Sequence, residues 1–353
     1  MLDNSDIFFI RRCFQLAQLG IGSVSPNPAV GAVIVFKGRI IGEGFHKYYG
    51  GAHAEVEAVN CVSKKNKSLL PHSTIYVSLE PCFHFGKTPP CVDLILREKI
   101  KRVVVAVIDP NPKVGGKSIE KLKSAGVEVD LMNENDWTED LINLKRKTLS
   151  PFLTRIEEKR LHIILKWAQT QDGFIGQHDR RIIISNEMTK RLVHKWRSES
   201  DAIMVGSKTI LTDNPNLDNR YYFGKSPVRI TFDKEKKFAQ NLNIFNGKQE
   251  TIVFTAVKNA IAPYIYLEDY DSPSGLKNLL TLLHEKNIGS ILVEGGSMLL
   301  NSFIAAGIWE EARIVTGKKN LSEGIKTPVL KNAKLIKTEN VSGDIISYWI
   351  KDK

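Results

Sequence analysis

The chain has 353 residues, a formal net charge of +11 and an apolar fraction of 42%, which suits a globular protein of two domains. No apolar run is long enough to cross a membrane, and the acidic, polar start differs from a signal peptide. Four cysteines are too few for a disulfide scaffold, so we expect a cytoplasmic protein with reduced thiols. The positive excess is spread over both halves. It is compatible with phosphates or nucleic acid as partners, although a solvated basic surface is the simplest explanation.

In the first half, predicted strands and helices alternate. Ser5 can cap a first helix, which Gly20 and Gly22 end, and residues 30–35 and 39–44 form a predicted hairpin. The remaining predicted elements are helices that begin at His53, Cys91 and Ile119, and strands at residues 74–79, 103–108 and 127–131. This alternation predicts a layered α/β domain with a largely parallel sheet.

A split motif in this half consists of His53 and Glu55, followed by Pro81-Cys82 and then Cys91. Zinc prefers nitrogen and sulfur ligands, and three protein ligands leave the fourth position open for water. His-x-Glu followed by Pro-Cys and a second Cys is the signature of zinc deaminases that act on nucleobases. We therefore predict one zinc ion per chain, held by His53, Cys82 and Cys91. Glu55 would be the catalytic group that moves protons between water and substrate.

A structural explanation of these residues also exists. Free cysteines are usually small buried hydrophobic residues, and Cys13 and Cys61, in apolar helical settings, fit that explanation better than the motif cysteines do. His46 and His84 lie on predicted loops near the motif. From this placement alone, either could be a plain surface histidine.

The spacing of the motif cysteines departs from the Cys-x-x-Cys of most deaminases, because eight residues separate Cys82 from Cys91. This loop, which ends in Gly-Lys-Thr-Pro-Pro before Cys91, resembles that of the bifunctional riboflavin-biosynthesis deaminase–reductases. The resemblance continues through Pro26-Asn27-Pro28-Ala29-Val30-Gly31, Gly44-Phe45-His46, His53-Ala54-Glu55-Val56, Glu80-Pro81-Cys82 and Asp109-Pro110-Asn111-Pro112. It implies a cytidine-deaminase-like three-layer domain. In that family, the residues that match Asn27, His46, His84 and Lys87 face the deaminase substrate.

Residues 143–160 are charged, contain Ser150-Pro151 and have the composition of a helix end and a connector. We therefore expect one domain over residues 1–149 and a second over 150–353. Predicted strands at 161–168, 202–205, 228–232, 251–255 and 291–294, and helices at 187–198, 275–286 and 298–306, indicate a second α/β domain. Gly295-Gly296, between a strand and a helix, is a plausible phosphate cradle. As a motif it is weak, and no Rossmann glycine fingerprint accompanies it.

Three segments of the second half resemble the reductase half of the same family: Lys166-x-Ala168-x-Thr170-x-Asp172-Gly173, the stretch from Val205-Gly206 to Leu217, and Val293-Glu294-Gly295-Gly296. The resemblance implies a dihydrofolate-reductase-like α/β fold and the use of NADPH. By position, NADPH would be held by Ala168, Thr209, Asp213, Gly295, Gly296, Ser297, Met298, Leu299 and Leu300. The reductase substrate would be held by Lys166, Arg197, Leu217, Arg220 and Glu294, with the two arginines suited to its phosphate.

Two departures from the family concern the reductase half. The family usually has a Trp-Ile-Thr/Ser segment after the Asp-Gly turn, and the nearest match begins at Ile183. The acidic residue Asp218 stands two positions before Arg220. An acidic residue so close to an arginine that would bind phosphate is unexpected. Without the resemblance, Leu217 would be a core residue and the two arginines would be surface charges. Cofactor packing or affinity could therefore differ from that of the family.

Together, these features predict a bifunctional enzyme of riboflavin biosynthesis. The first domain would deaminate 2,5-diamino-6-ribosylamino-4(3H)-pyrimidinone 5′-phosphate. The second would reduce the ribosyl group to ribityl with hydride from NADPH, giving 5-amino-6-(5-phosphoribitylamino)uracil. Two alternatives remain: a nucleic-acid deaminase with an RNA-binding second half, and a deaminase with an inactive, structural second half. We expect phosphorylated pyrimidines as partners, no nucleic acid, no membrane, and a homo-oligomer.

Overall fold

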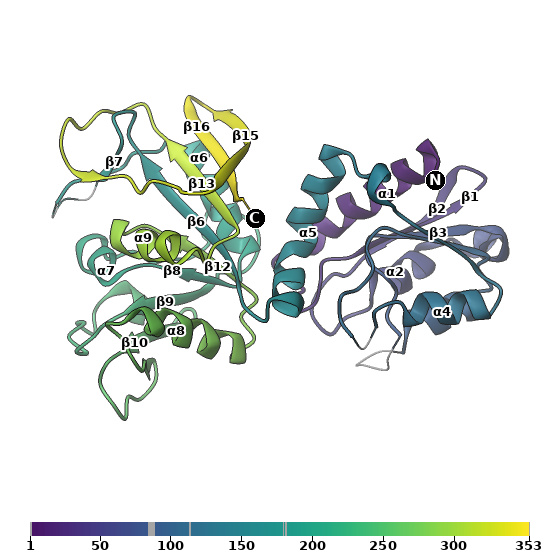
Figure 1. The fold of residues 1–353 in the computed structure, drawn as a ribbon, viewed down its shortest axis with the longest axis horizontal. Helices are drawn as coiled ribbons and strands as arrows, with labels where there is room; N and C mark the ends of the chain where they lie inside the picture. Colours follow the sequence, from purple (N-terminus) through teal and green to yellow (C-terminus); the bar gives the residue numbers. More distant parts are fainter. Residues whose placement is uncertain (1, 84–88, 113, 179, 181, 353) are drawn as a thin grey trace. The chain divides into compact units, whose positions relative to one another are not determined.

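The structure is a computed structural model that describes residues 2–83, 89–112, 114–178, 180 and 182–352. Its chain forms two compact units, Met1–Lys159 and Arg160–Lys353 (Figure 1). Helix α5 (Glu139–Glu157) runs through the expected connector and contains Pro151, so the units separate after this helix. Within the described ranges, no helix is both long and apolar enough to span a bilayer.

The first unit is built on a five-stranded sheet with the strand order β2-β1-β3-β4-β5. These strands are β1 (Gly31–Phe36), β2 (Arg39–Phe45), β3 (Thr74–Val77), β4 (Arg102–Val105) and β5 (Glu128–Leu131). β1 is antiparallel to both β2 and β3, whereas β3, β4 and β5 are parallel. The predicted hairpin is thus confirmed, whereas the prediction of a largely parallel sheet is wrong in this unit, because two of the four strand pairs are antiparallel.

Helices cover both faces of this sheet. α1 (Asn4–Ala17) and α5 pack on one face, where Phe14, Leu149 and Val33 share a buried cluster. On the other face lie α2 (Ala54–Cys61), α3 (Cys91–Arg97) and α4 (Lys117–Ser124). Shorter 3-10 helices span Gln18–Gly20, Lys64–His72 and Glu134–Asp136. The predicted three-layer domain is confirmed.

Two local predictions in this unit are wrong. The cap of α1 is Asp3 rather than Ser5, because the Asp3 carboxylate accepts the backbone N–H groups of Ser5 and Asp6, which the first helical turn leaves unpaired. Cys61 is exposed, and it is the last residue of α2. Cys13 is fully buried, as expected of a structural cysteine.

The second unit contains a nine-stranded sheet with the order β11-β10-β9-β8-β12-β6-β13-β16-β15. The pairs from β11 to β13 are parallel, and β16 is antiparallel to both β13 and β15. The strands are β6 (His162–Gln169), β8 (Ala202–Met204), β9 (Val228–Phe232), β10 (Thr251–Thr255), β11 (Tyr264–Tyr266), β12 (Ser290–Glu294), β13 (Glu311–Thr316), β15 (Ala333–Val341) and β16 (Asp344–Lys351). Two short strands, β7 (Phe174–Gly176) and β14 (Ile325–Lys326), pair separately.

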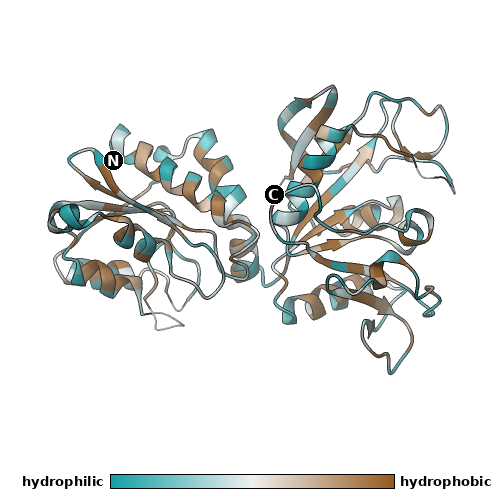
Figure 2. Ribbon diagram, turned by 180° about the vertical axis from the view of Figure 1, so that it is seen from behind, coloured by the Kyte–Doolittle hydropathy of each residue, from teal (hydrophilic) through white to brown (hydrophobic). Residues whose placement is uncertain are grey.

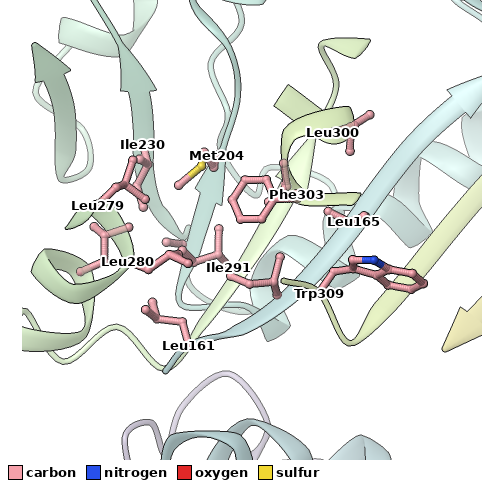
Figure 3. Close-up of a cluster of buried hydrophobic side chains, with 14 of the residues drawn as sticks. Leu161, Leu165, Met204, Ile230, Leu279, Leu280, Ile291, Leu300, Phe303 and Trp309 are labelled. Carbon is pink, nitrogen blue, oxygen red and sulfur yellow. The ribbon is translucent and has the colours of Figure 1, made fainter. Parts of the chain in front are cut away.

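The helices of this unit are α6 (Glu187–Glu199), α7 (Ser207–Asp213), α8 (Pro273–Glu285) and α9 (Ser297–Ala306), with a 3-10 helix at Asn243–Phe245. Figure 2 shows hydrophobic residues along the strands of both units. In the main core of the second unit, strand residues such as Leu165 and Ile291 meet Leu279 of α8 and Phe303 of α9 (Figure 3). Because β6, β8 and β12 are parallel neighbours, the segments that follow them begin at one edge of the sheet.

Candidate active sites

The zinc motif of the first unit is placed by three element ends. His53 is the N-terminal cap of α2, so Glu55 lies in the first turn of that helix. Cys91 is the first residue of α3, and Cys82 follows β3 after a short connection. The prediction that the motif residues stand at helix starts and at a strand end is therefore confirmed.

All three predicted metal ligands come together. Their ligand atoms lie within 4.8 Å of one another, and both Cys82 Sγ and Cys91 Sγ are 3.4 Å from His53 Nδ1. The backbone N–H of Cys91 also donates to Cys82 Sγ at 3.2 Å. His53 Nδ1 can form a hydrogen bond with only one of the two sulfur atoms at a time, whereas a cation at the centre of the cluster would bind all three ligand atoms. The donor set of one nitrogen and two sulfurs fits Zn²⁺ with an open fourth position.

The electrostatics of the motif residues differ from one another. A hydrogen bond from the Cys91 thiol, together with those from His53 and the Cys91 N–H, lowers the pKa of Cys82 to about 4. The hydrogen bond to Cys82 and burial raise the pKa of Cys91 well above its usual range. Of the two thiols, Cys82 is therefore the one that the protein itself favours as a thiolate. Burial, and secondarily the charge of Cys82, raises the pKa of Glu55, which suits a group that both takes and gives a proton.

A cavity of about 290 Å³ opens beside this cluster. Its lining includes His53, Glu55 and Cys82, together with Asn27 and His46. His46 Nδ1 lies 2.9 Å from the carbonyl oxygen of Ala52, so this nitrogen must carry the proton and donate it. The other ring nitrogen, Nε2, then accepts from the Asn27 amide at 3.2 Å. Burial lowers the pKa of His46, so the ring stays neutral.

The remaining two deaminase residues of the prediction, His84 and Lys87, lie outside the described residues. The structure adds lining residues that the sequence analysis did not assign to the site: Tyr49, Asp109, Asn111, Val114 and Phe152. The loop that carries three of them is fastened by Glu80, whose carboxylate accepts from Asp109 N at 3.2 Å, Gly116 N at 3.0 Å and the Ser118 hydroxyl. The Asp-Pro-Asn-Pro turn was the available signal for this loop, whereas nothing in the sequence marked Phe152.

The predicted NADPH-binding residues gather at the carboxyl edge of the second sheet. Ala168 is in β6, Thr209 and Asp213 are in α7 after β8, and Gly295 and Gly296 follow β12. Both glycines have positive φ angles, 76° and 79°, and Gly296 caps α9, which has no acidic residue in its first turn. A Cβ at Gly296 would lie 3.6 Å from Thr209 Oγ1, so the start of α9 faces α7 closely. A helix start that follows two glycines suits a phosphate-bearing cofactor.

The four residues that follow in α9 differ in exposure. Ser297 is half-buried, Met298 is 87% exposed and Leu299 is partly buried. The Leu300 side chain is fully buried in the core of the second unit (Figure 3). Leu300 can therefore contact a cofactor only through its backbone.

The predicted substrate-binding residues of the reductase form a charged cluster around Glu294. Arg197 Nε and Nη2 donate to the two oxygens of Glu294 at 2.8 and 2.9 Å, and Lys166 Nζ lies 3.6 Å from the same carboxylate. Burial alone would raise the pKa of Glu294, but Arg197 and Lys166 outweigh it and hold the pKa at about 2. Burial also lowers the pKa of Lys166. This arrangement fixes an ionised carboxylate beside a buried amine.

Arg220 lies on the loop that follows Leu217, a buried residue with a φ of 52°. Its guanidinium pairs with the carboxylate of Asp218, and its backbone N–H donates to His194 Nδ1 at 3.2 Å. The structure thus brings Arg197 and Arg220 to the two sides of Asp218, since Arg197 Nη1 donates to the Asp218 carbonyl at 3.1 Å. Leu217 packs as the core residue that its hydrophobicity alone suggested.

Two family models match the chain. Residues 161–345 match the RibD C-terminal domain, and residues 3–107 match the cytidine and deoxycytidylate deaminase zinc-binding region. The riboflavin biosynthesis protein RibD of Aquifex aeolicus is 36% identical over 366 residues, which cover 99% of both chains. The chain belongs to the RibD family. RibD of Actinobacillus pleuropneumoniae is 35% identical, with 92% of this chain and 87% of that protein covered.

Solved structures of RibD agree over the whole chain. The diaminohydroxyphosphoribosylaminopyrimidine deaminase/5-amino-6-(5-phosphoribosylamino)uracil reductase of Thermotoga maritima is 33% identical, with a TM-score of 0.88 and 98% of this chain and 99% of that chain covered. Acinetobacter baumannii RibD has a TM-score of 0.86 at 27% identity, covering 99% of each chain.

Membership of the RibD family supports the first interpretation of the sequence. The chain is a bifunctional enzyme of riboflavin biosynthesis with a deaminase domain and a reductase domain, and its cofactors are Zn²⁺ and NADPH. The predicted resemblance and fold classes are confirmed. The alternative of an RNA-binding second half is not supported, because that half matches the RibD C-terminal domain.

Proposed function

We propose that the first unit deaminates 2,5-diamino-6-ribosylamino-4(3H)-pyrimidinone 5′-phosphate, and that the second reduces the ribosyl group of the product to ribityl. The names of the Thermotoga maritima relative's two activities support this substrate pair. The observation that carries the proposal is the convergence of His53, Cys82 and Cys91 beside the buried Glu55 in a cavity. A homo-oligomeric enzyme of the cytoplasm stays an expectation from the sequence.

In the deaminase, we assign zinc to His53, Cys82 and Cys91. When bound, zinc supplies a water molecule that ionises near neutral pH. Glu55, which is 3% exposed, would take the proton of that water and pass it to the leaving amine. His46 would hold the Asn27 amide in one orientation, because its unprotonated Nε2 accepts only the N–H side of that amide.

His84 and Lys87, which lie outside the described residues, stay predictions as contacts of the deaminase substrate. Both would come from the loop between Cys82 and Cys91. Lys87 would add a positive charge toward the substrate's phosphate.

In the reductase, NADPH supplies the hydride when it is bound. We assign its binding to Ala168, Thr209, Asp213 and residues 295–300, which lie along the carboxyl edge of the sheet. The N–H groups at the start of α9 would donate hydrogen bonds to phosphate oxygens. The hydride acceptor would then lie near the edge where β6 and β12 end.

The substrate of the reductase would lie against Glu294, Lys166 and the loop that follows Leu217. Glu294 would accept hydrogen bonds from hydroxyl groups of the substrate, since its charge is fixed by Arg197 and Lys166. The Arg197 side chain is 14% exposed and occupied by Glu294, whereas that of Arg220 is 41% exposed. Arg220 is therefore the better placed of the two to receive the substrate's phosphate.

Replacement of Glu55 by Gln tests the deaminase proposal. The amide keeps the shape of the side chain but cannot carry the proton, so ammonia release should fall by about 10²- to 10⁴-fold while bound zinc is retained. Glu57→Gln, on the same helix and 24% exposed at its side chain, is the matched control and should stay active. Undiminished ammonia release by zinc-loaded Glu55→Gln protein would remove Glu55 from the mechanism.

A deaminase with an inactive reductase domain is the second candidate, because Ile183 stands where the family has Trp and is 65% exposed. The two candidates are separated by the oxidation of NADPH by the full chain, which is monitored by absorbance with the deaminated intermediate as substrate. Turnover supports the bifunctional enzyme. Absence of turnover in protein that still releases ammonia supports the inactive domain.

A further inference from the structure

Asp218 contacts both arginines that the reductase site offers to an anionic substrate. Its carboxylate pairs with Arg220 Nη1, and its backbone carbonyl accepts from Arg197 Nη1 at 3.1 Å. The Asp218 side chain is 27% exposed and that of Arg220 is 41% exposed, so solvent and ligands can reach this pair. The carboxylate thus stands where an external anion would bind to Arg220.

Arg220 is held in place by contacts that do not involve the Asp218 carboxylate. Its backbone N–H donates to His194 Nδ1 at 3.2 Å, and its guanidinium carbon lies 5.0 Å from the centre of the Tyr221 ring. The rings of His194 and Tyr221 pack edge to face at 4.8 Å. Lys190 Nζ lies 4.4 Å from the centre of the same Tyr221 ring. The loop therefore does not need the carboxylate of Asp218 in order to present Arg220.

The balance of charges in the site also places the Asp218 carboxylate in the way of an anion that approaches Arg220. Among these groups, the cations Lys166, Arg197 and Arg220 face the carboxylates of Glu294 and Asp218. Glu294 is enclosed by two of the cations, which leaves Arg220 with Asp218. A phosphate that approaches Arg220 must either displace the Asp218 carboxylate or lie beside a group of like charge, and both cost binding free energy.

We propose that Asp218 is an affinity-determining residue of the reductase, whose carboxylate competes with the substrate's phosphate for Arg220. This inference rests on the proposed function, because it takes the reductase substrate to be phosphorylated. It predicts that the wild-type enzyme binds its substrate more weakly than its two arginines would allow. The opposite role, in which Asp218 pre-orients Arg220 for the phosphate, predicts the opposite change on mutation.

Asp218→Asn removes the charge but keeps the backbone carbonyl that binds Arg197. KM for the phosphorylated intermediate should fall about 2- to 5-fold, the range set by a partly exposed ion pair, with kcat unchanged. KM for the dephosphorylated intermediate should stay the same. Glu285→Gln, an exposed residue of α8, makes the same change in net charge and should alter neither. A KM for the phosphorylated intermediate that rises or does not change in Asp218→Asn overturns the proposal.

A second measurement does not depend on turnover. Inorganic phosphate should raise the melting temperature of the full-length protein through binding to the folded state. The part of this shift that is lost in Arg220→Gln reports binding at Arg220, and that part should reach half-saturation at about 2- to 5-fold lower phosphate in Asp218→Asn. If the wild type oxidises no NADPH, the proposed function fails, while the phosphate titration still decides the role of Asp218. An Arg220-dependent shift that is equal in wild type and Asp218→Asn contradicts the competition.

Discussion

In the first unit, two sulfur atoms approach a single imidazole nitrogen, whereas in the second unit a carboxylate is enclosed by a guanidinium and an amine. The His53–Cys82–Cys91 cluster offers a cation three ligand atoms that lie within 4.8 Å of one another. The cluster of Glu294 balances its charges within the chain, through Arg197 and Lys166. The first site should therefore be sensitive to metal removal. The second should be sensitive to the loss of one partner.

The largest expected effect is the loss of one zinc ligand. Cys91→Ser should abolish stoichiometric zinc binding and reduce ammonia release by about 10³-fold or more, because the metal contributes several kcal/mol to the transition state. NADPH oxidation with the deaminated intermediate should persist, since the second unit has its own charge balance. Zinc content by metal analysis and the two activities check the prediction. Cys61→Ser, at the exposed cysteine, should behave as wild type.

Loss of the Glu294 carboxylate should have a comparably large effect on the second unit. Glu294→Gln leaves the buried Arg197 and Lys166 without their counter-ion, which should cost about 3–5 kcal/mol of unfolding free energy and abolish reduction. Urea denaturation and NADPH oxidation measure the two losses, while ammonia release by the first unit should be retained. Glu268→Gln, an exposed position of the same unit, is the control. A stability equal to that of the control would show that the three charges are not coupled.

A smaller effect is expected from the pH dependence of the second unit. Burial, and then the charge of Arg197, lowers the pKa of His194 from 6.5 to about 4. The unfolded chain therefore binds the proton first as the pH falls from 6.5 to 4, and the free energy of unfolding should drop by about 2 kcal/mol across this window. His194→Gln, which can still accept from Arg220 N, should lose this part of the drop. Urea titrations of both proteins at pH 7 and pH 4.5 provide the comparison, and parallel curves would contradict it.

The smallest of these effects concerns the neutral histidine beside the zinc cluster. Asn27→Asp replaces the N–H group that His46 Nε2 accepts with a second acceptor, which favours a protonated ring or drives the side chains apart. The kcat/KM of deamination should fall about 10-fold, the size of one misplaced hydrogen bond near the substrate. Zinc content should not change. An unaltered kcat/KM would show that the contact does not orient the site.

The first site could be predicted from the sequence because its residues form a known signature, although 29 and 38 positions separate His53 from the two cysteines. His53 and Cys91 stand at helix starts, and Cys82 follows a strand end, so the predicted elements agreed with the signature. The second site could not be derived in this way. Arg197 and Glu294 are 97 positions apart, and their bidentate contact depends on the packing of α6 beside β12. The pairing of Asp218 with Arg220 was visible only as an unexpected acidic residue.

The fold was predictable where hydrophobic segments are strong and less so elsewhere. The parallel strands β6, β8 and β12 were expected, but the strands after residue 306 were not. Of these, β15 contains only exposed and half-buried residues, so it lacks a strong hydrophobic pattern, and its place at the sheet edge follows from hairpin pairing with β16. Likewise α5 continues through Pro151, because burial of neighbouring Leu149 outweighs the local preference to break.

The central claim is that the two units act in sequence on one phosphorylated pyrimidine. The most direct test is mass spectrometry of 2,5-diamino-6-ribosylamino-4(3H)-pyrimidinone 5′-phosphate after incubation with the zinc-loaded full-length protein, with and without NADPH. The account predicts replacement of an amine by oxygen in both reactions, and a further gain of two hydrogens only with NADPH. An unchanged substrate, or reduction without prior deamination, would contradict it.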